Sequence, residues 1–276
     1  MSLQFFAALL GSFAQTLGYT LPYLAVSAVV FGVLSRISPC NAGRPWWHKR
    51  GLITDLSYWI FIPVLTRLAR IGFTVLFTVY LLGITDSDAI ARFFAHGHGP
   101  LARLPLWTQI VLYLVVADLM LYWIHRAFHR GTLWKYHAVH HVSVDLDWTS
   151  AARFHPLNII FGATLVDVLM LVAGIKPDVF LFLMPFTTLS SAFVHANLDW
   201  TLGPFKYLFA SPVFHRWHHA LPDTDGDKNF ASNFPFFDLL FGTFHMPEGK
   251  LPVHYGIDDK NMPENMGMQI LYPLMH

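Results

Sequence analysis

The chain has 276 residues, 54% of them apolar and only 13% charged, with a formal net charge of +1 and a mean hydropathy of +0.45. Soluble domains carry about 25% charged residues, so this composition favours a membrane protein. The dispersed lysines and arginines form no basic face, which argues against nucleic acid as a partner, and the single cysteine, Cys40, excludes an intramolecular disulfide and a four-cysteine metal site.

The first stretch, MSLQFFAALLGSFAQ, lacks the positive charges that open a secretory signal, so we expect it to belong to the mature protein. Beyond it, the sequence contains apolar runs near the length of about 20 residues that crosses a bilayer. They are Leu17–Ile37, Leu106–Ile124, Leu157–Ile175 and Val179–Val194. Only the segment GIKPD separates the last two runs, which predicts a tight helical hairpin.

Another apolar stretch, Leu56–Ile84, carries Arg67 and Arg70. One interpretation is a single tilted span whose arginines reach toward the headgroups. We prefer an interfacial amphipathic helix over Asp55–Arg70, followed by a span that begins near Ile71.

The loops predict the orientation. Basic residues concentrate after the first span and after the Leu106–Ile124 span, at Arg36, Arg44, Lys49 and Arg50 and at Arg126, Arg130 and Lys135. The positive-inside rule places both loops in the cytosol. We therefore expect an all-α integral membrane protein with four to five transmembrane helices and a cytosolic helical cap rich in histidine. Its membrane would be the bacterial inner membrane or the endoplasmic reticulum.

Three histidine clusters carry the chemistry. They are H-x-x-x-H at His125 and His129, H-x-x-H-H at His137, His140 and His141, and a second H-x-x-H-H at His215, His218 and His219. Positions i, i+3 and i+4 share one face of a helix, so each cluster presents a pair of imidazoles. Without a metal, imidazoles packed in this way would protonate and repel one another near neutral pH. The clusters therefore predict metal binding.

The number of ligands implies two ions, because eight neutral ligands exceed what one ion can hold. Imidazole suits iron, copper, zinc and nickel, and the general affinity order favours copper or zinc. The H-E-x-x-H pattern of zinc hydrolases is absent from the sequence. We favour iron, because two irons at a membrane surface can activate O2 against an unactivated C–H bond.

Further elements carry a resemblance to a known family. DLMLYWIH leads into His125, ARFHP covers Ala152–Pro156, HANLDW covers His195–Trp200, and DKNFASNFPFFDLLFGTFHMP follows the last cluster. With the histidine clusters, these elements resemble the fatty acid hydroxylase / sterol desaturase superfamily over residues 115–247. We accordingly divide the chain into an N-terminal membrane region, 1–104, a fatty acid hydroxylase-like catalytic domain, 105–247, and a tail, 248–276.

The resemblance implies a membrane-bound non-haem di-iron oxygenase whose lipid substrate enters from the bilayer. It implies nine ligands: His125, His129, His137, His140, His141, His195, His215, His218 and His219. His155 is a further candidate, either as a ligand or beside Arg153. The sequence departs from the pattern at Asn158, where relatives often carry an acid, and at Asp199, where some carry another histidine.

Ligand imidazoles usually donate their second N–H to a carboxylate or a carbonyl. Acids close enough in sequence for this role are Asp118, Asp145, Asp147, Asp223, Asp225 and Asp238. We favour Asp118, because it lies seven residues before His125 on the same helical face. Together with Asp118 and Asp238, the possible ligands or supporting groups are His155, Arg153, Asn197 and Asp199.

The expected activity is hydroxylation of a lipid C–H bond with O2 and two electrons, where the lipid is fatty acyl, sterol-like or related. A desaturase with the same di-iron centre is one alternative, and a membrane protein that binds or transports metal without catalysis is another. The sequence resembles no haem or flavin domain, so the electrons would come from a separate reductase, ferredoxin or cytochrome b5.

Overall fold

The computed structural model describes residues 3–43, 45–221 and 227–275, and its regular elements are helices. The long helices are α1 (Leu3–Ile37), α2 (Leu52–Leu82), α4 (Leu106–Phe128) and α8 (Pro177–His195). The shorter ones are α3 (Ser87–His96), α5 (Trp134–His141), α6 (Pro156–Ile159), α7 (Leu165–Ala173), α9 (Pro212–His218), α10 (Phe236–Leu240) and α11 (Met266–Met275). The described residues contain no β-strand beyond one isolated bridge between Ala220 and Tyr255. The all-α prediction is confirmed.

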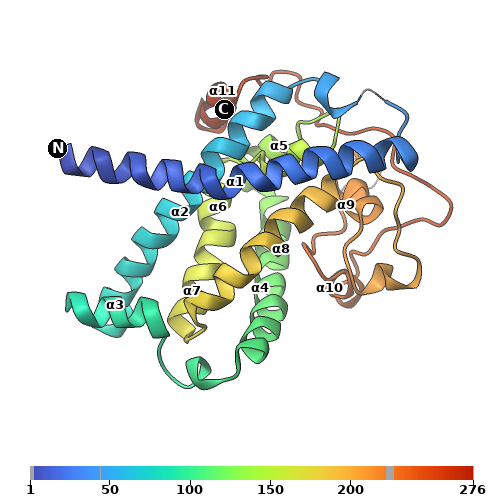
Figure 1. Ribbon diagram of the computed structural model, residues 1–276. Coiled ribbons are helices and arrows are strands. Elements are labelled where there is room, and N and C mark those ends of the chain that lie inside the picture. The colour runs from blue at the N-terminus through green and yellow to red at the C-terminus, as the bar shows by residue number, and fades with distance from the viewer. Residues whose placement is uncertain (1–2, 44, 222–226, 276) are drawn as a thin grey trace.

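Five helical segments are long and apolar enough to cross a membrane, which agrees with a multi-pass membrane protein. They are Leu10–Ile37, Leu52–Leu82, Leu106–Phe128, Pro156–Ala173 and Pro177–His195. In Figure 1, α2, α4, α6–α7 and α8 run between the two ends of a bundle, whereas α1 lies across α2 and α8 and contacts both. The short helices α5, α9 and α11 gather at one end of this bundle, and α3 lies near the other.

The preferred interpretation of the second apolar stretch is wrong, because α2 is one continuous helix of 31 residues with no break at Ile71. Both arginines have partners within the protein. Arg67 donates to the Gln15 side chain at 2.6 Å, and Arg70 pairs with Asp167. Since neither guanidinium has to reach the headgroups, the helix can continue past them.

The predicted hairpin after Leu157 is confirmed. Gly174 ends α7 with φ +111°, and a Cβ at this position would lie 2.4 Å from the carbonyl oxygen of His98, so only glycine fits. Pro177 then opens α8 at its first turn. Between α6 and α7, residues Ile160–Thr164 form a wider π-type turn with Gly162 outside helical geometry (φ −93°, ψ −112°). This irregular turn lines the cavity beside the histidines that is described below, and such bulges often occur at functional sites.

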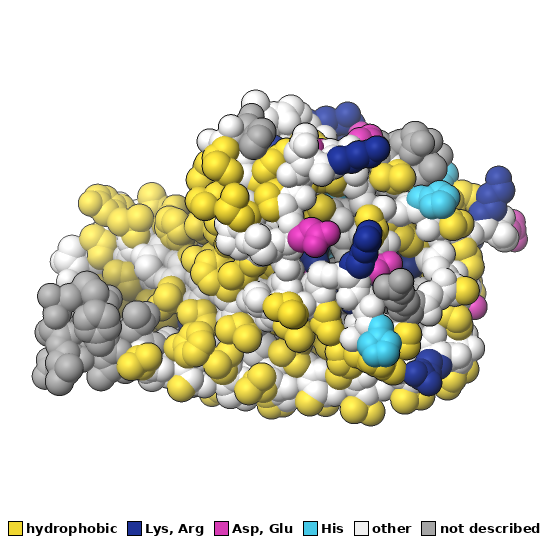
Figure 2. Space-filling model, turned by 90° about the horizontal axis from the view of Figure 1, so that it is seen from above, with side chains coloured by type: hydrophobic (Ala, Val, Ile, Leu, Met, Phe, Trp, Pro, Cys, Tyr) yellow, Lys and Arg dark blue, Asp and Glu magenta, His cyan; other side chains and the backbone are white. Residues whose placement is uncertain are grey.

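The cap end is polar. Figure 2, seen from above, shows charged and histidine side chains gathered over one half of this face and apolar side chains along its edge. Beneath that face lies a buried ion cluster. Asp55, at the start of α2, accepts from Lys49 at 2.7 Å and from Arg153 Nε at 2.7 Å, and Lys49 also contacts Asp147 at 3.2 Å.

This cluster ties three separate segments together, and it yields a prediction. Replacing Asp55 by alanine leaves the buried Lys49 and Arg153 without their shared anion, which costs about 3–5 kcal/mol in comparable buried pairs. We expect unfolding of the Asp55→Ala protein in detergent at a clearly lower temperature or denaturant concentration. The matched control Asp258→Ala removes an exposed acid and should change stability by less than about 0.5 kcal/mol. Equal stability of the two variants would contradict the anchoring role.

Candidate metal centre

The histidines lie where four helices end at the cap. His125 is in the last turn of α4 and His129 caps that helix. Gly131, with φ +51°, then allows the chain to turn into α5, which carries His137, His140 and His141. His195 is the last residue of α8, and α9 brings the remaining three histidines. Gly131 therefore interrupts the helical path between α4 and α5, and the nine histidines come from α4, α5, α8 and α9 and their caps.

The structure brings all nine histidines named from the resemblance into two adjacent groups. One group contains His125, His129, His137, His141 and His218, and the other contains His140, His195, His215 and His219. Within each group, one ring nitrogen per residue lies within 4.8 Å of every other. The groups are in direct contact, since the rings of His141 and His219 stack with centroids 4.3 Å apart.

The Nε2 atoms converge to distances that suit a shared cation. They are 3.0 Å apart for His125 and His137, 3.2 Å for His137 and His141, 3.3 Å for His140 and His195, and 3.1 Å for both His195–His215 and His215–His219. Metal–nitrogen bonds of 2.0–2.1 Å place neighbouring ligand atoms roughly 3 Å apart at right angles. One proton can be shared by two facing imidazoles but not by a converging set. The Nε2 atoms of His129 and His218 are moreover buried with no hydrogen-bond partner. A metal ion would satisfy these lone pairs.

Most of the opposite ring nitrogens are held in place. Nδ1 bonds to the backbone carbonyls of Phe230 for His125 (2.7 Å), Arg153 for His140 (3.0 Å), Ser191 for His195 (2.7 Å) and Lys228 for His218 (2.7 Å). His137 Nδ1 bonds to the side-chain oxygen of Asn158 at 2.7 Å. Such contacts set the tautomer and aim Nε2 at the metal. The residue that departs from the family pattern, Asn158, thus takes the supporting position with an amide.

Burial keeps these imidazoles neutral. Seven of the nine lie outside the membrane-spanning helices: His129, His137, His140, His141, His215, His218 and His219. Burial, reinforced by neighbouring imidazoles, lowers the pKa of each well below the usual 6.5. The expectation that metal-free imidazoles would protonate near neutral pH is therefore wrong for these rings, because burial disfavours the charged form. Their lone pairs are free of protons at neutral pH, as metal binding requires.

The favoured supporting acid, Asp118, has a different role. Its carboxylate accepts from the backbone N–H of Asn233 (2.9 Å) and Phe234 (2.9 Å) and from the Asn233 side chain (3.0 Å). Asp238 similarly accepts from the backbone N–H of Phe230 at 2.7 Å and of Ala231 at 2.9 Å. Both acids shape the loop between α9 and α10, and this loop supplies the carbonyl that holds His125. Sequence spacing indicated the correct helical face for Asp118 but not its partner.

The other candidates lie around the two groups. His155 caps α6 by accepting from Leu157 N–H at 3.1 Å, and its other nitrogen bonds to the Ile270 carbonyl at 3.0 Å. Arg153 contributes its carbonyl to His140. Asn197 bonds to the backbone of Asn41, and Asp199 is exposed. Of the remaining acids, Asp145 accepts from Arg50 N–H, Asp147 belongs to the ion cluster, and Asp223 and Asp225 lie outside the described residues.

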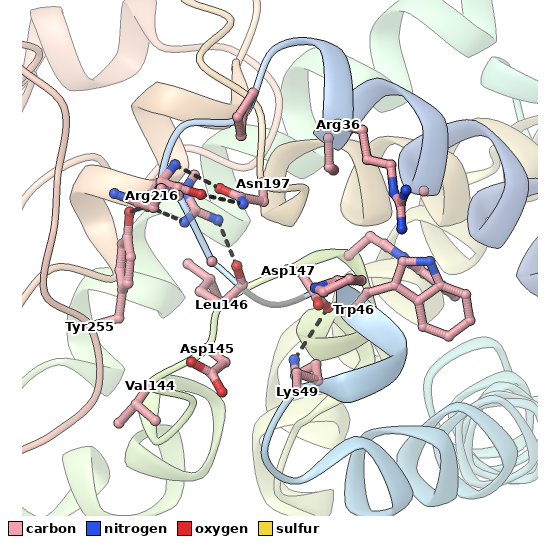
Figure 3. Close-up of a pocket in the computed structure, with 18 of the residues that line it drawn as sticks. Arg36, Trp46, Lys49, Val144, Asp145, Leu146, Asp147, Asn197, Arg216 and Tyr255 are labelled. Carbon is pink, nitrogen blue, oxygen red and sulfur yellow. Dashed lines mark hydrogen bonds and ion pairs between the residues drawn. The ribbon is translucent and has the colours of Figure 1, made fainter.

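Sequence reasoning missed Arg216, which stands between the ligands of the last cluster and is 1% exposed. Its guanidinium donates to the Leu146 carbonyl at 2.7 Å, to the Asn41 side chain at 2.5 Å and to the Tyr255 hydroxyl at 3.1 Å (Figure 3). These residues line a cavity of about 620 Å³ at the polar end of α1. A charged residue inside H-R-W-H-H was the available signal, and its role is to fasten three distant segments onto α9.

Comparison with known proteins agrees with this arrangement, because residues 110–243 match the family model described as fatty acid hydroxylase. This part of the chain is similar to the fatty acid hydroxylase family. The matched range contains all nine histidines, and the resemblance inferred from the sequence is confirmed. No solved structure matches the chain.

The named relatives of this region are hydroxylases or monooxygenases of lipids. The chain is 35% identical over 167 residues to ornithine lipid hydroxylase OlsE of Rhizobium tropici, a match that covers 60% of this chain and 50% of the relative. It is 32% identical over 152 residues to human alkylglycerol monooxygenase, which covers 55% and 33%. It is 30% identical over 147 residues to methylsterol monooxygenase 2-2 of Arabidopsis thaliana, which covers 51% and 55%. The chain thus spans about a third to a half of the length of these relatives.

The geometry predicts which histidines govern metal content. His137→Ala and His140→Ala each remove a converging nitrogen from one group, and we expect purified protein with much less bound metal by elemental analysis. His155→Asn keeps an N-cap acceptor at α6 and lies outside both groups, so its metal content should equal that of the unchanged protein. A lower metal content in His155→Asn, or an unchanged metal content in His140→Ala, would show that the residues of the two groups are wrongly assigned.

Proposed function

We propose that this protein oxidises a C–H bond of a membrane lipid with O2, by hydroxylation, at a di-iron centre held by the nine histidines. The observation that carries this proposal is a cavity of about 320 Å³ that starts at the histidines and continues between the membrane-spanning helices. His125, His137, His140, His195 and His215 line one end of it. Apolar side chains, among them Leu121, Ile124, Leu183 and Met184, line the cavity beside and beyond the histidines. A lipid chain in this cavity would lie against the metal centre.

Two ions and iron are the finer parts of the proposal. The nine imidazoles form one group of five and one group of four, and the ring nitrogens converge within each group. This arrangement suits two cations, one in each group. An all-imidazole donor set suits iron, and the kinship with lipid hydroxylases and monooxygenases favours it over zinc or copper. When bound, the irons would supply the activation of O2 that no side chain here can perform.

The protein's own residues would bind and align the lipid. Phe154 stacks on His140 with centroids 4.0 Å apart and interplanar angle 11°, and it also lines the cavity. Its ring therefore both fixes a ligand and presents an apolar surface to the substrate. Ile159 and Val194 extend this apolar surface beside the histidines. An apolar wall excludes water and leaves the C–H bonds of the chain as the available reactants.

Two electrons per turnover would come from a separate donor of the reductase, ferredoxin or cytochrome b5 type. The cap end, where both basic loops and the histidines lie, would face the cytosol by the positive-inside rule. This orientation makes the metal centre accessible to a soluble donor. The membrane would be the bacterial inner membrane or the endoplasmic reticulum.

Product analysis tests the activity. Lipids of a host with and without this chain, grown under isotopically labelled O2, should differ by a lipid that has gained one labelled oxygen atom. His140→Ala should abolish that product while the protein is still made. A product that has lost two hydrogens without gaining oxygen would identify a desaturase instead. Unchanged lipids, in the presence of iron and a reductase, would overturn the oxygenase assignment in favour of a non-catalytic metal-binding protein.

A second, apolar cavity indicates the route of entry. It has a volume of about 500 Å³, lies between α1, α8 and the loop around Phe209, and includes Phe31, Phe186 and Phe193. It shares Ser190 and Asn233 with the cavity that starts at the histidines, called the metal cavity below. The side chains of these two residues are hydrogen-bonded at 3.3 Å. We take this contact as the threshold that a lipid crosses on its way from the bilayer to the histidines.

A bulky side chain at the threshold should block entry. Ser190→Trp is expected to lower product formation at least tenfold while metal content stays unchanged, because residue 190 lies at the junction of the two cavities. Thr188→Trp, on the same helix but in the lining of neither cavity, is the matched control and should retain activity. Comparable activity of the two variants would place the entrance elsewhere.

A further inference from the structure

A polar cluster closes the end of the metal cavity that lies away from the histidines. It contains Arg70 of α2, Tyr113 of α4 and Asp167 of α7, and all three line the cavity. The Asp167 carboxylate accepts from the Tyr113 hydroxyl on one oxygen and from the Arg70 guanidinium on the other. Three membrane-spanning segments thus contribute one residue each to a single site.

The cluster lies far from the histidines along the bundle, with Asp167 buried and the Arg70 side chain 35% exposed. Tyr113 precedes His125 by twelve residues in one helix, which corresponds to about 18 Å along its axis. Asp167 lies twelve residues beyond His155, in the apolar segment Pro156–Ala173. Ionisable side chains at such depth are costly and usually mark a site that meets a substrate or an ion. The metal cavity is therefore polar at both ends and apolar between them.

The unused hydrogen-bonding capacity of this cluster consists of donors. Both oxygens of Asp167 are engaged, whereas a guanidinium has five N–H donors. Arg70 Nε is buried and has no hydrogen-bond partner. The positive charge of Arg70 is already balanced by Asp167, so a second anion would bring a negative charge that nothing in the cluster compensates. The remaining capacity fits an acceptor oxygen that bears no charge.

We infer that the Arg70–Tyr113–Asp167 cluster binds a small uncharged oxygen group of the lipid substrate, such as a hydroxyl, an ether or a carbonyl. This inference rests on the proposed function and narrows it to lipids that carry such an oxygen at one end of an apolar segment. The carbon to be oxidised lies at the opposite end, beside the histidines. The group must be small, because the cavity, at about 320 Å³, is at the lower limit for ligand pockets. The entrance at Ser190 lies toward the histidine end, so the oxygen group has to fit inside the cavity at the opposite end.

A clamp between helices, with no ligand, is the competing explanation for the same three residues. A clamp predicts that loss of Arg70 lowers stability and leaves ligand preference unchanged. Recognition predicts that it removes the preference for an oxygen-bearing chain. Ligand preference therefore separates the two explanations, whatever happens to stability.

Binding can be measured without turnover. Purified protein in detergent would be loaded with a fluorescent long-chain alkyl probe, and a long-chain primary alcohol, the alkane of equal chain length and the corresponding fatty acid would compete for it. We expect the alcohol to bind on the order of tenfold more tightly than the alkane, the contribution of one hydrogen bond to a charged donor. The fatty acid should bind no more tightly than the alcohol.

Variants then locate the preference. Arg70→Met should reduce the preference for alcohol over alkane to about unity. Arg67→Met is the matched control, because Arg67 lies three residues earlier on α2, donates to Gln15 and lies outside the cavity lining, and it should keep the preference. If Arg70→Met does not fold, Arg70→Lys retains the pairing charge but lacks Nε, and it should lose most of the preference.

Equal binding of alcohol and alkane by the unchanged protein would overturn the inference without any variant. So would an Arg70→Met protein that retains the preference, and tighter binding of the fatty acid would replace the uncharged group by an anion. The proposed activity is judged separately by the labelled-oxygen product in the host. A labelled product without the binding preference would refute the inference alone, and the preference without any product would refute the activity alone.

Discussion

The crowding of nine imidazoles into two touching groups is the constraint on which the rest of this structure depends. Ring nitrogens that converge to 3.0–3.3 Å cannot satisfy one another with protons, because each neutral imidazole has one donor and one acceptor. The protein makes the arrangement possible by burying the rings, which lowers the pKa of those in the cap, and by tying the opposite nitrogens to backbone carbonyls and to Asn158. The result is a set of lone pairs prepared for cations.

Everything around the histidines serves to hold four helix ends together. Asp118 and Asp238 shape the loop whose carbonyls fix His125 and His218. The ion cluster at Asp55 joins α2 to the segment that ends at Arg153. Arg216 joins α9 to Asn41 in the loop after α1 and to Tyr255 in the tail. The tail also packs on the cap, where α11 contacts α2 and α5. These contacts are charged and buried, so they are specific in geometry and costly to break.

The cavity beneath the cap connects this polar construction to the bilayer. Its walls are apolar where α4 and α8 face each other, which favours a hydrocarbon segment. Its ends carry imidazoles on one side and a neutralised ion pair on the other. A cavity of this kind selects a substrate by the distance between two of its features as well as by hydrophobicity. The relatives known by name are hydroxylases or monooxygenases of different lipids, namely an ornithine lipid, an alkylglycerol and a methylsterol.

The sequence alone was sufficient for the class of fold, four of the spans, the hairpin, the family and the nine histidines. These features depend on local patterns: the length of apolar runs, the i, i+3, i+4 spacing on a helix, and the turn residues Gly131, Gly174 and Pro177. It also contained Asn158, Arg216 and Arg70, but the partners of these residues lie 21 to 175 positions away along the chain. Only the tertiary structure decided that α2 continues past its arginines, that Asp118 supports a loop, and that His155 bonds to the Ile270 carbonyl of the tail. Each of these outcomes depends on which partner a polar side chain meets once distant segments pack together, and no local pattern specifies that choice.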